Sequence, residues 1–135
     1  MKIIIVGCGR IGIAMLANLV NEGHEVLAID NDPAIITELT NTYDVMCICG
    51  NGADSDVLKE AGVEDCEMFA AVTPSDELNM LACLFAKRMG AKHTIARIRN
   101  PEYAEQVMTM RDIFPLSLTV NPEKQAAMEI ERLLR

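Results

Sequence analysis

The chain has 135 residues, half of them apolar, and a formal net charge of −8 at pH 7. This length fits one domain with a sizeable core, and the apolar fraction excludes an intrinsically disordered chain. The acidic balance argues against binding to nucleic acid or to an anionic membrane surface, and no apolar run reaches the ~20 residues of a membrane-spanning helix.

Apolar runs, helical periodicity and glycine or proline punctuation predict that strands and helices alternate along the chain. Strands are expected at 2–7, 25–30, 44–49, 68–72, 94–98 and 117–120. Helices are expected at 10–22, 33–41, 54–61, 76–89, 102–112 and 122–135. The first strand is apolar on both faces, as in a parallel sheet covered by helices. The pattern predicts an α/β fold, a Rossmann-like doubly wound parallel sheet of six strands in the order 3-2-1-4-5-6.

The first strand leads into a glycine-rich loop with the spacing G-x-G-x-x-G, Gly7-Cys8-Gly9-Arg10-Ile11-Gly12. In this motif Gly7 allows a sharp turn, Gly9 allows a pyrophosphate to approach the backbone, and Gly12 allows the next helix to pack closely on the sheet. The second strand ends in Asp30, where an acid hydrogen-bonds ribose hydroxyls. A glycine turn that binds nothing is the competing interpretation, but the acid in this position favours a dinucleotide site.

Charged residues near the motif restrict the ligand. Arg10 is the single Lys or Arg between the first strand and Lys59. A cation at a helix N-terminus opposes the helix dipole, and a bound pyrophosphate would compensate it; a solvated surface arginine is the alternative. Asp30 is followed by Asn31 and Asp32, so a 2′-phosphate would meet carboxylates. We therefore expect NAD-type or other adenosine ligands rather than NADP.

Two further strand ends are expected at the same edge of the sheet. The turn after the third strand contains Asn51, Gly52 and Ala53, which either flank an adenine or form an ordinary turn. The fourth strand ends at Thr73 and Pro74. The next residues are expected to cap a helix, and the Thr73 hydroxyl is a candidate hydrogen-bond partner for a cofactor.

Arg97 and Arg99 alternate with apolar residues in the fifth predicted strand. An arginine in a strand covered on both faces is costly unless it has a partner. Arg97 is therefore expected either to pair with a carboxylate or to point at a phosphate. His24 is expected at the surface in a helix–strand turn, and His93 is expected to open the fifth strand; neither is given a catalytic role.

The five cysteines are expected to be reduced thiols, because their number is odd and the chain begins with a strand rather than a secretory leader. The same start predicts a cytoplasmic protein. Cys47 and Cys49 share one face of a strand, and small buried side chains are favoured over a metal pair, since no second pair accompanies them. For Cys8, a tolerated small side chain is favoured over a redox-sensitive thiol.

The last segment predicts a helix that follows the nucleotide-binding domain of residues 1–120. Asn121 suits the N-cap and Pro122 the first turn of this helix, and the cap and the helix together make up the terminal segment 121–135. Its apolar stripe consists of Ala126, Ile130, Leu133 and Leu134. We expect the stripe to pack on its own sheet, or to reach a partner subunit or a further domain; a two-fold dimer is the favoured outcome.

Together these segments resemble the nucleotide-binding N-terminal domain of the regulatory subunits of Trk and Ktr potassium-uptake systems, known as the RCK or KTN domain. The resemblance covers nearly the whole chain. It rests on Gly7-Cys8-Gly9-Arg10-Ile11-Gly12, Gly50-Asn51-Gly52-Ala53-Asp54 with Val57-Leu58, Ala71-Val72-Thr73 with Asp76-Glu77-Asn79, Ile95-Ala96-Arg97-Ile98, Asn100-Pro101-Glu102-Tyr103 and Pro122.

The resemblance implies a cytoplasmic regulator that is peripheral to the inner face of the membrane and is not an enzyme. In the family, the residues matching the glycine loop, Asp30, Thr73 and Arg97 contact NAD(H) or an adenine nucleotide such as ATP, ADP or AMP. The domains form dimers, usually assemble into rings on a membrane potassium transporter, and exchange the terminal helix. Family members usually carry a second C-terminal ligand domain, which this sequence does not include. The candidate nucleotide-binding residues are Gly7, Cys8, Gly9, Arg10, Ile11, Gly12, Asp30, Asn31, Asn51, Gly52, Ala53, Thr73, Pro74 and Arg97.

Two other functions use the same fold. The cofactor-binding domain of an NAD-dependent oxidoreductase is the main alternative, but a dehydrogenase needs a substrate pocket and a positioned acid–base group. The predicted elements use all 135 residues and leave no separate substrate domain. A redox-sensing or adapter module based on Cys8 is the second alternative. No direct membrane insertion, no catalytic residue and no metal site are expected.

Overall fold

The computed structural model describes residues 1–112 and 118–120. Six parallel strands form one sheet in the order β3-β2-β1-β4-β5-β6, which confirms the predicted topology. They are β1 (Lys2–Val6), β2 (Glu25–Asp30), β3 (Met46–Cys49), β4 (Met68–Ala71), β5 (His93–Arg97) and β6 (Leu118–Val120). The terminal helix predicted at 121–135, and the domain boundary before it, lie outside the described residues.

The helices begin close to the predicted positions. They are α1 (Arg10–Asn21), α2 (Pro33–Thr42), α3 (Ser55–Glu60), the 3-10 turn η1 (Val63–Asp65), α4 (Asp76–Met89) and α5 (Pro101–Thr109). The third strand begins at Met46 rather than at 44, because Met46 is the first residue that pairs with β2. In the described part of the chain, no helix combines the length and apolarity needed to cross a bilayer.

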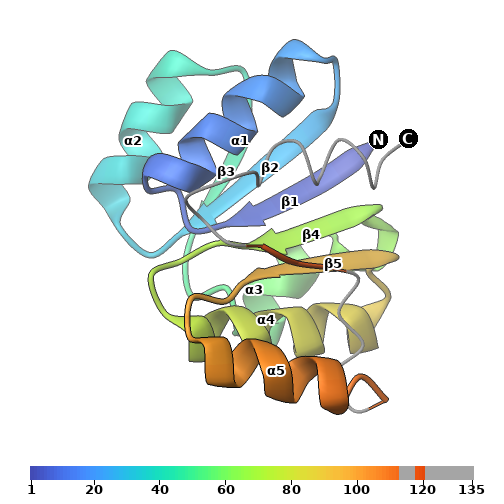
Figure 1. Ribbon diagram of the computed structural model, residues 1–135. Helices are drawn as coiled ribbons and strands as arrows, with labels where there is room; N and C mark the ends of the chain where they lie inside the picture. The colour runs from blue at the N-terminus through green and yellow to red at the C-terminus, as the bar shows by residue number, and fades with distance from the viewer. Residues whose placement is uncertain (113–117, 121–135) are drawn as a thin grey trace.

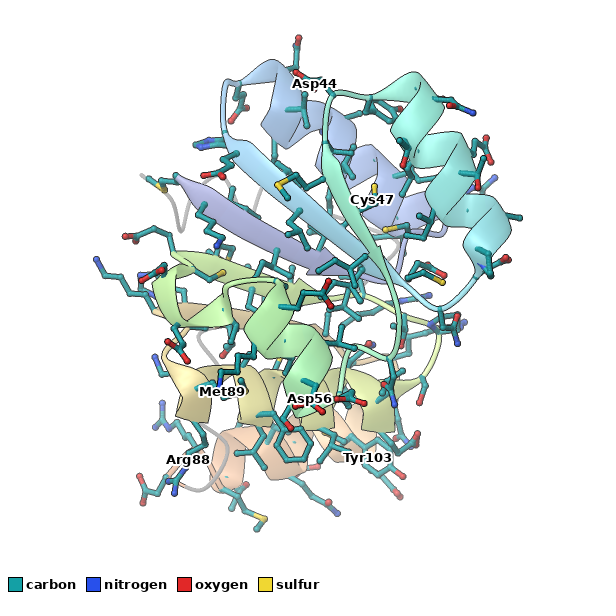
Figure 2. All side chains as sticks on the ribbon, turned by 180° about the vertical axis from the view of Figure 1, so that it is seen from behind. Asp44, Cys47, Asp56, Arg88, Met89 and Tyr103 are labelled. Carbon is teal, nitrogen blue, oxygen red and sulfur yellow. The ribbon has the colours of Figure 1, made fainter. Side chains whose placement is uncertain are left out.

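Helices cover both faces of the sheet: α1 and α2 lie on one face, and α3, α4 and α5 on the other (Figure 1). Alternate residues of β1 therefore enter two separate cores. Ile3 and Ile5 pack in the core under α1 and α2, whereas Ile4 and Val6 pack in the core under the other helices. All four are buried. The view from behind shows β3, with Cys47 on it, at the edge of the sheet (Figure 2).

The order of the strands places a crevice between the ends of β1 and β4. These strands are neighbours, but β1 leads to α1 on one face and β4 leads to α4 on the opposite face. The loops after the two strands therefore diverge, and in sheets of this kind ligands bind where they separate. Because all strands are parallel, the loops after β2 and β3 reach the same edge.

Candidate functional site

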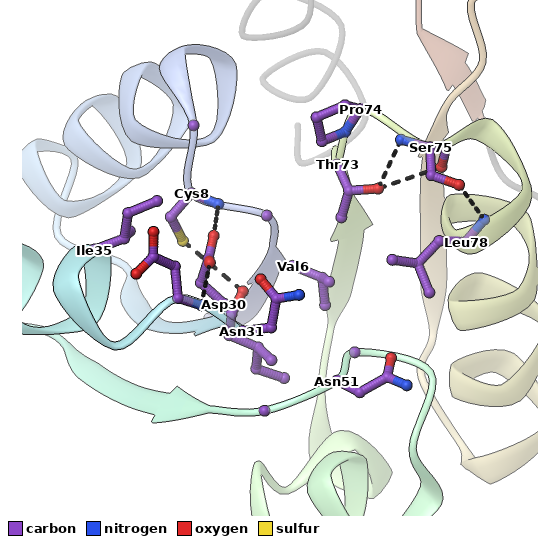
Figure 3. Close-up of a pocket in the computed structure, with 16 residues that line it drawn as sticks. Val6, Cys8, Asp30, Asn31, Ile35, Asn51, Thr73, Pro74, Ser75 and Leu78 are labelled. Atoms are coloured by element: carbon purple, nitrogen blue, oxygen red, sulfur yellow. Dashed lines mark hydrogen bonds between the residues drawn. The ribbon is translucent and has the colours of Figure 1, made fainter.

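A cavity of about 500 Å³ opens at this edge of the sheet (Figure 3). The predicted site residues that line it are Gly7, Cys8, Gly9, Asp30, Asn31, Asn51, Gly52, Thr73 and Pro74. The lining residues outside the predicted set are Val6, Ile29, Asp32, Ile35, Gly50, Ser75 and Leu78. Ile35 and Leu78 belong to the first turns of α2 and α4. Their position just after a strand end is the signal that points to them.

Glycine is needed at the three positions of the loop for different physical reasons. Gly7 has a φ of +93°, and a Cβ added to it would lie 2.8 Å from the Thr73 backbone nitrogen. A Cβ on Gly12 would collide with the Gly7 carbonyl oxygen. Gly9 has an ordinary φ of −76°, and a Cβ there would meet nothing within 4 Å. Folding therefore requires Gly7 and Gly12, whereas the space above Gly9 is available to a ligand that approaches the backbone.

Helix α1 begins at this loop without a capping side chain. Its N-cap residue is Gly9, which has no side chain to accept a hydrogen bond from the first turn. Each of the other α-helices within the described ranges has a side-chain cap, from Asp32, Asp54, Ser75 or Asn100. The free N–H groups and the positive dipole end of α1 together favour an anionic ligand.

Asp30 joins the end of β2 to the glycine loop. Its Oδ2 accepts a hydrogen bond from the Cys8 backbone nitrogen at 2.8 Å, and its Oδ1 accepts one from the Asp32 backbone nitrogen at 2.9 Å. A carboxylate oxygen has two acceptor positions, so each oxygen of Asp30 keeps one for a ligand hydroxyl. The acid can therefore hold the loop and bind a ribose at the same time.

Thr73 forms the opposite wall of the cavity with Pro74 and Ser75 (Figure 3). Its hydroxyl oxygen lies 2.7 Å from Asn79 Oδ1 and 3.2 Å from the backbone oxygen of Ser75. It also accepts a hydrogen bond from the Ser75 backbone nitrogen at 3.2 Å. Because the single hydroxyl proton goes to the protein, Thr73 faces the cavity as a hydrogen-bond acceptor.

The TrkA-N domain family model matches residues 3–113. The chain belongs to the TrkA-N domain family. It is 37% identical over 138 residues to the Trk system potassium uptake protein TrkA of Vibrio alginolyticus, covering 100% of this chain and 30% of that protein. It is 31% identical over 134 residues to the TrkA homolog of Methanothermobacter thermautotrophicus, covering 99% of this chain and 60% of that protein. The Streptomyces coelicolor TrkA is 41% identical over 106 residues, covering 78% and 48%. The chain therefore spans between 30% and 60% of the length of these relatives.

Solved structures support the fold of this TrkA-N domain. The TrkA-N domain of the inner membrane protein ybaL from Escherichia coli superposes with a TM-score of 0.81 at 18% identity, covering 99% of this chain and 96% of that one. The GsuK channel bound to NAD superposes with a TM-score of 0.76 at 20% identity, covering 89% of this chain and 21% of the channel chain. The Kef C-terminal domain of Shewanella denitrificans in its AMP-bound form superposes with a TM-score of 0.70 at 19% identity, covering 99% of this chain and 77% of that one.

Carboxylates dominate the charges around the cavity of the TrkA-N domain. Asp30 and Asp32 line it, and no Lys, Arg or His is among the described lining residues. Arg10 is the first residue of α1, and its side chain is exposed. A phosphate in the cavity would therefore depend on the N–H groups of the loop. A phosphate contact of Arg10 from the rim stays a prediction.

Five of the predicted site residues do not line the cavity: Arg10, Ile11, Gly12, Ala53 and Arg97. Gly12 is buried under the loop, where it serves packing. Arg97 lies behind the wall, and its Nη1 donates a hydrogen bond to the Thr73 carbonyl oxygen at 3.2 Å. The carboxylate or phosphate contact expected for Arg97 stays a prediction. Arg99 lies beyond the end of β5, where its backbone nitrogen donates a hydrogen bond to the Asp76 carboxylate at 2.9 Å.

The cysteines differ in burial, and Cys47 is half-buried. Cys8 is buried, and burial together with the nearby charge of Asp30 raises the pKa of its thiol to about 12. Such a thiol is unreactive at neutral pH, which supports the small-side-chain interpretation. Cys49, predicted to be buried, is exposed, because it is the last residue of the edge strand and only Cys47 packs against the α1–α2 core. No cluster of three or more metal-ligating side chains occurs among the described residues.

Proposed function

We propose that this TrkA-N domain binds an adenine nucleotide, with NAD(H) as the main candidate, and that it regulates a membrane potassium-uptake transporter. One observation carries the proposal: the open space at Gly9, the uncapped start of α1 and the spare acceptor positions of Asp30 meet in a single cavity. The names of the relatives supply the potassium system, and NAD, ADP and AMP appear in the names of structural neighbours.

Each part of the nucleotide has a matching group in the cavity. The N–H groups at the start of α1 would hold the phosphates, and Asp30 would accept hydrogen bonds from the ribose hydroxyls. Ile35 and the loop that contains Asn51 and Gly52 would border the adenine. A 2′-phosphate would meet Asp30 and Asp32 with no cation among the described lining residues, which supports a preference for NAD(H) over NADP(H).

The proposed role is regulation rather than catalysis. Among the described residues, the titratable groups that line the cavity are Cys8, Asp30 and Asp32. The thiol of Cys8 keeps its proton, and both carboxylates accept hydrogen bonds from backbone N–H groups. A dehydrogenase needs a positioned acid–base group beside its substrate, and the described lining residues supply no His, Lys or Tyr for that role, so an oxidoreductase is the weaker candidate. We also propose a peripheral cytoplasmic location, set by the transporter, and dimers or larger rings that use the predicted helix at 121–135.

Calorimetric titration tests the ligand. NADH, NAD, ATP, ADP and AMP are the probes, and NADPH is the matched control that differs from NADH by one phosphate. Binding of adenine nucleotides with a clear preference for NADH over NADPH is expected. If no nucleotide binds, or if NADPH binds more tightly, the proposal is wrong.

Rubidium uptake tests the regulatory role. Cells that express the chain with its Trk-type transporter are compared with cells that carry the Gly9→Val variant. Uptake is expected to depend on the intact glycine loop. Equal uptake with both proteins, when both are folded, contradicts a nucleotide-dependent regulator.

A further inference from the structure

The first turn of α4 carries two side chains that are polar and yet buried. Asn79 is fully buried and Asp76 is 9% exposed; with Thr94 they are the buried polar residues of the described chain. A buried polar side chain is costly unless hydrogen bonds satisfy it. Both residues lie directly behind the cavity wall formed by the loop between β4 and α4.

Asn79 uses all the hydrogen-bonding capacity of its amide. Its Oδ1 accepts from the Thr73 backbone nitrogen at 2.9 Å and lies 2.7 Å from the Thr73 hydroxyl. Its Nδ2 donates to the Thr73 carbonyl oxygen at 3.0 Å and to the Arg97 carbonyl oxygen at 2.8 Å. An amide has two acceptor positions and two donor hydrogens, and all four are used here. One side chain thus holds the backbone and hydroxyl of Thr73 and ties them to the end of β5.

Asp76 extends the same connection to the next loop. Its two carboxylate oxygens accept hydrogen bonds from the backbone nitrogens of Arg99 and Asn100, at 2.9 and 2.8 Å. The first turn of α4 therefore joins the cavity wall to the loop between β5 and α5. The residues of this second loop are not among those that line the nucleotide cavity.

We propose that Asn79 is a positioning residue of the nucleotide site, which sets the place of Thr73 and turns its hydroxyl toward the cavity as an acceptor. The inference rests on the proposed nucleotide binding. Thr73 stands against the glycine loop, since its backbone nitrogen lies 2.8 Å from the place of a Cβ on Gly7. A shift of Thr73 would therefore change the width of the cavity between its two walls. Asn79 itself does not line the cavity, so it acts through Thr73.

A double-mutant cycle on the full chain tests this role with NADH as the probe. Thr73→Val and Asn79→Ala are each expected to weaken NADH binding by about tenfold, and the double variant by about tenfold rather than a hundredfold, because the two residues act as one unit. The matched control is Cys83→Ala. Cys83 is one turn further along α4 and equally buried, and its thiol donates a hydrogen bond to the Ile95 carbonyl of β5, whereas Asn79 bonds to Thr73.

The control is expected to lower the melting temperature while NADH affinity stays within twofold. A folded Asn79→Ala variant that binds NADH like the wild type overturns the proposal, and so do losses that multiply in the double variant. A folded control that loses NADH binding to the same degree assigns the effect to general loosening of α4 and also overturns it.

Hydrogen exchange on the wild-type chain gives a test that does not depend on the folding of any variant. NADH is expected to slow exchange of the Thr73 amide, which Asn79 holds, and of the Arg99 and Asn100 amides, which Asp76 holds. Protection of the Cys8 amide alone would support nucleotide binding but overturn the role of Asn79. If NADH protects neither the Cys8 amide nor the other three amides, the proposed function itself has failed.

Discussion

The cavity has one wall made by the glycine loop and β2, and another made by the loop between β4 and α4, and the two are held by different contacts. In the first wall a carboxylate, Asp30, holds backbone N–H groups and still has acceptor positions to spare. In the second, the amide of Asn79 is saturated by its four contacts with Thr73 and Arg97. The first wall is therefore suited to bind the ligand directly, and the second to fix the width of the site.

The largest expected effect separates two glycines within the first wall. Gly12→Ala places a methyl group against the Gly7 carbonyl, and we expect it to lower the free energy of unfolding by about 2–3 kcal/mol. Gly9→Ala adds the same methyl group in open space, so its effect on stability should stay within about 1 kcal/mol. NADH affinity should nevertheless fall by about tenfold or more in Gly9→Ala, since the methyl group occupies the approach to the loop. Urea unfolding and calorimetry measure the two effects, and equal stability losses would contradict the distinction.

Asp30 gives the next largest effect. Asp30→Ala removes charged hydrogen bonds, each worth about 1.5–3 kcal/mol, and should weaken NADH binding by roughly ten- to a hundredfold. It should also release the Cys8 and Asp32 amides, so their hydrogen exchange should quicken in the free protein. An affinity loss with unchanged exchange would show that the acid touches only the ligand. In contrast, Asp76→Ala in the second wall should speed exchange at Arg99 and Asn100, with NADH affinity changed by less than about threefold.

Alkaline pH should reveal the buried thiol of the first wall. Burial raises the pKa of Cys8 to about 12, from about 9 in the unfolded chain. Above pH 9 the unfolded chain ionises while the native state keeps its proton, so the unfolded state is stabilised and the free energy of unfolding falls until about pH 12. Cys8 alone lowers the free energy of unfolding by up to about 1.4 kcal/mol per pH unit in this range. Cys8→Ala should therefore show a shallower decline in urea unfolding between pH 9 and 11, and parallel declines would contradict this environment.

The smallest expected effect is on the rate at which a reagent labels the cysteine thiols. An aromatic disulfide reagent at pH 8 should label one thiol quickly, because Cys49 is exposed, whereas Cys47 is half-buried and the other three thiols are buried. Cys49→Ser should remove this fast phase. NADH should not alter it, since Cys49 does not line the cavity. Slowing by NADH would mean that the ligand extends beyond the edge of β3.

The first wall was predictable from the sequence because its parts lie close together along the chain. The turn at Gly7, the open position at Gly9 and the acid at the end of β2 form one strand–helix–strand unit with a recognisable spacing. The order of the six strands followed from the alternation of strands and helices, which is also a local pattern. The family resemblance rested on the same motifs and is confirmed.

The second wall was predicted only in part, because its contacts join residues far apart in the sequence. Thr73 was recognised as a strand-end residue, but its bond to Arg97 spans 24 positions, and no local pattern indicates it. Asn79 resembles any polar residue of a helix until the packing of α4 on β5 shows that it is buried. The exposure of Cys49 likewise depends on which strand lies at the edge of the sheet and on how far the helix cover extends.

Asp30 holds the glycine loop and is also the proposed ribose ligand, and this combination has a consequence for coenzyme engineering. The usual route from NAD(H) to NADP(H) preference replaces the acid after the second strand with a small or basic residue, which makes room for the 2′-phosphate. Here that exchange would also withdraw the acceptor from the Cys8 and Asp32 amides, and the glycine loop, which we propose holds the phosphates, would lose this contact. A switch of coenzyme in this scaffold therefore needs a second substitution that restores an acceptor for the Cys8 amide. Single-site libraries at position 30 should yield weak binders of both coenzymes rather than specific binders of the new one.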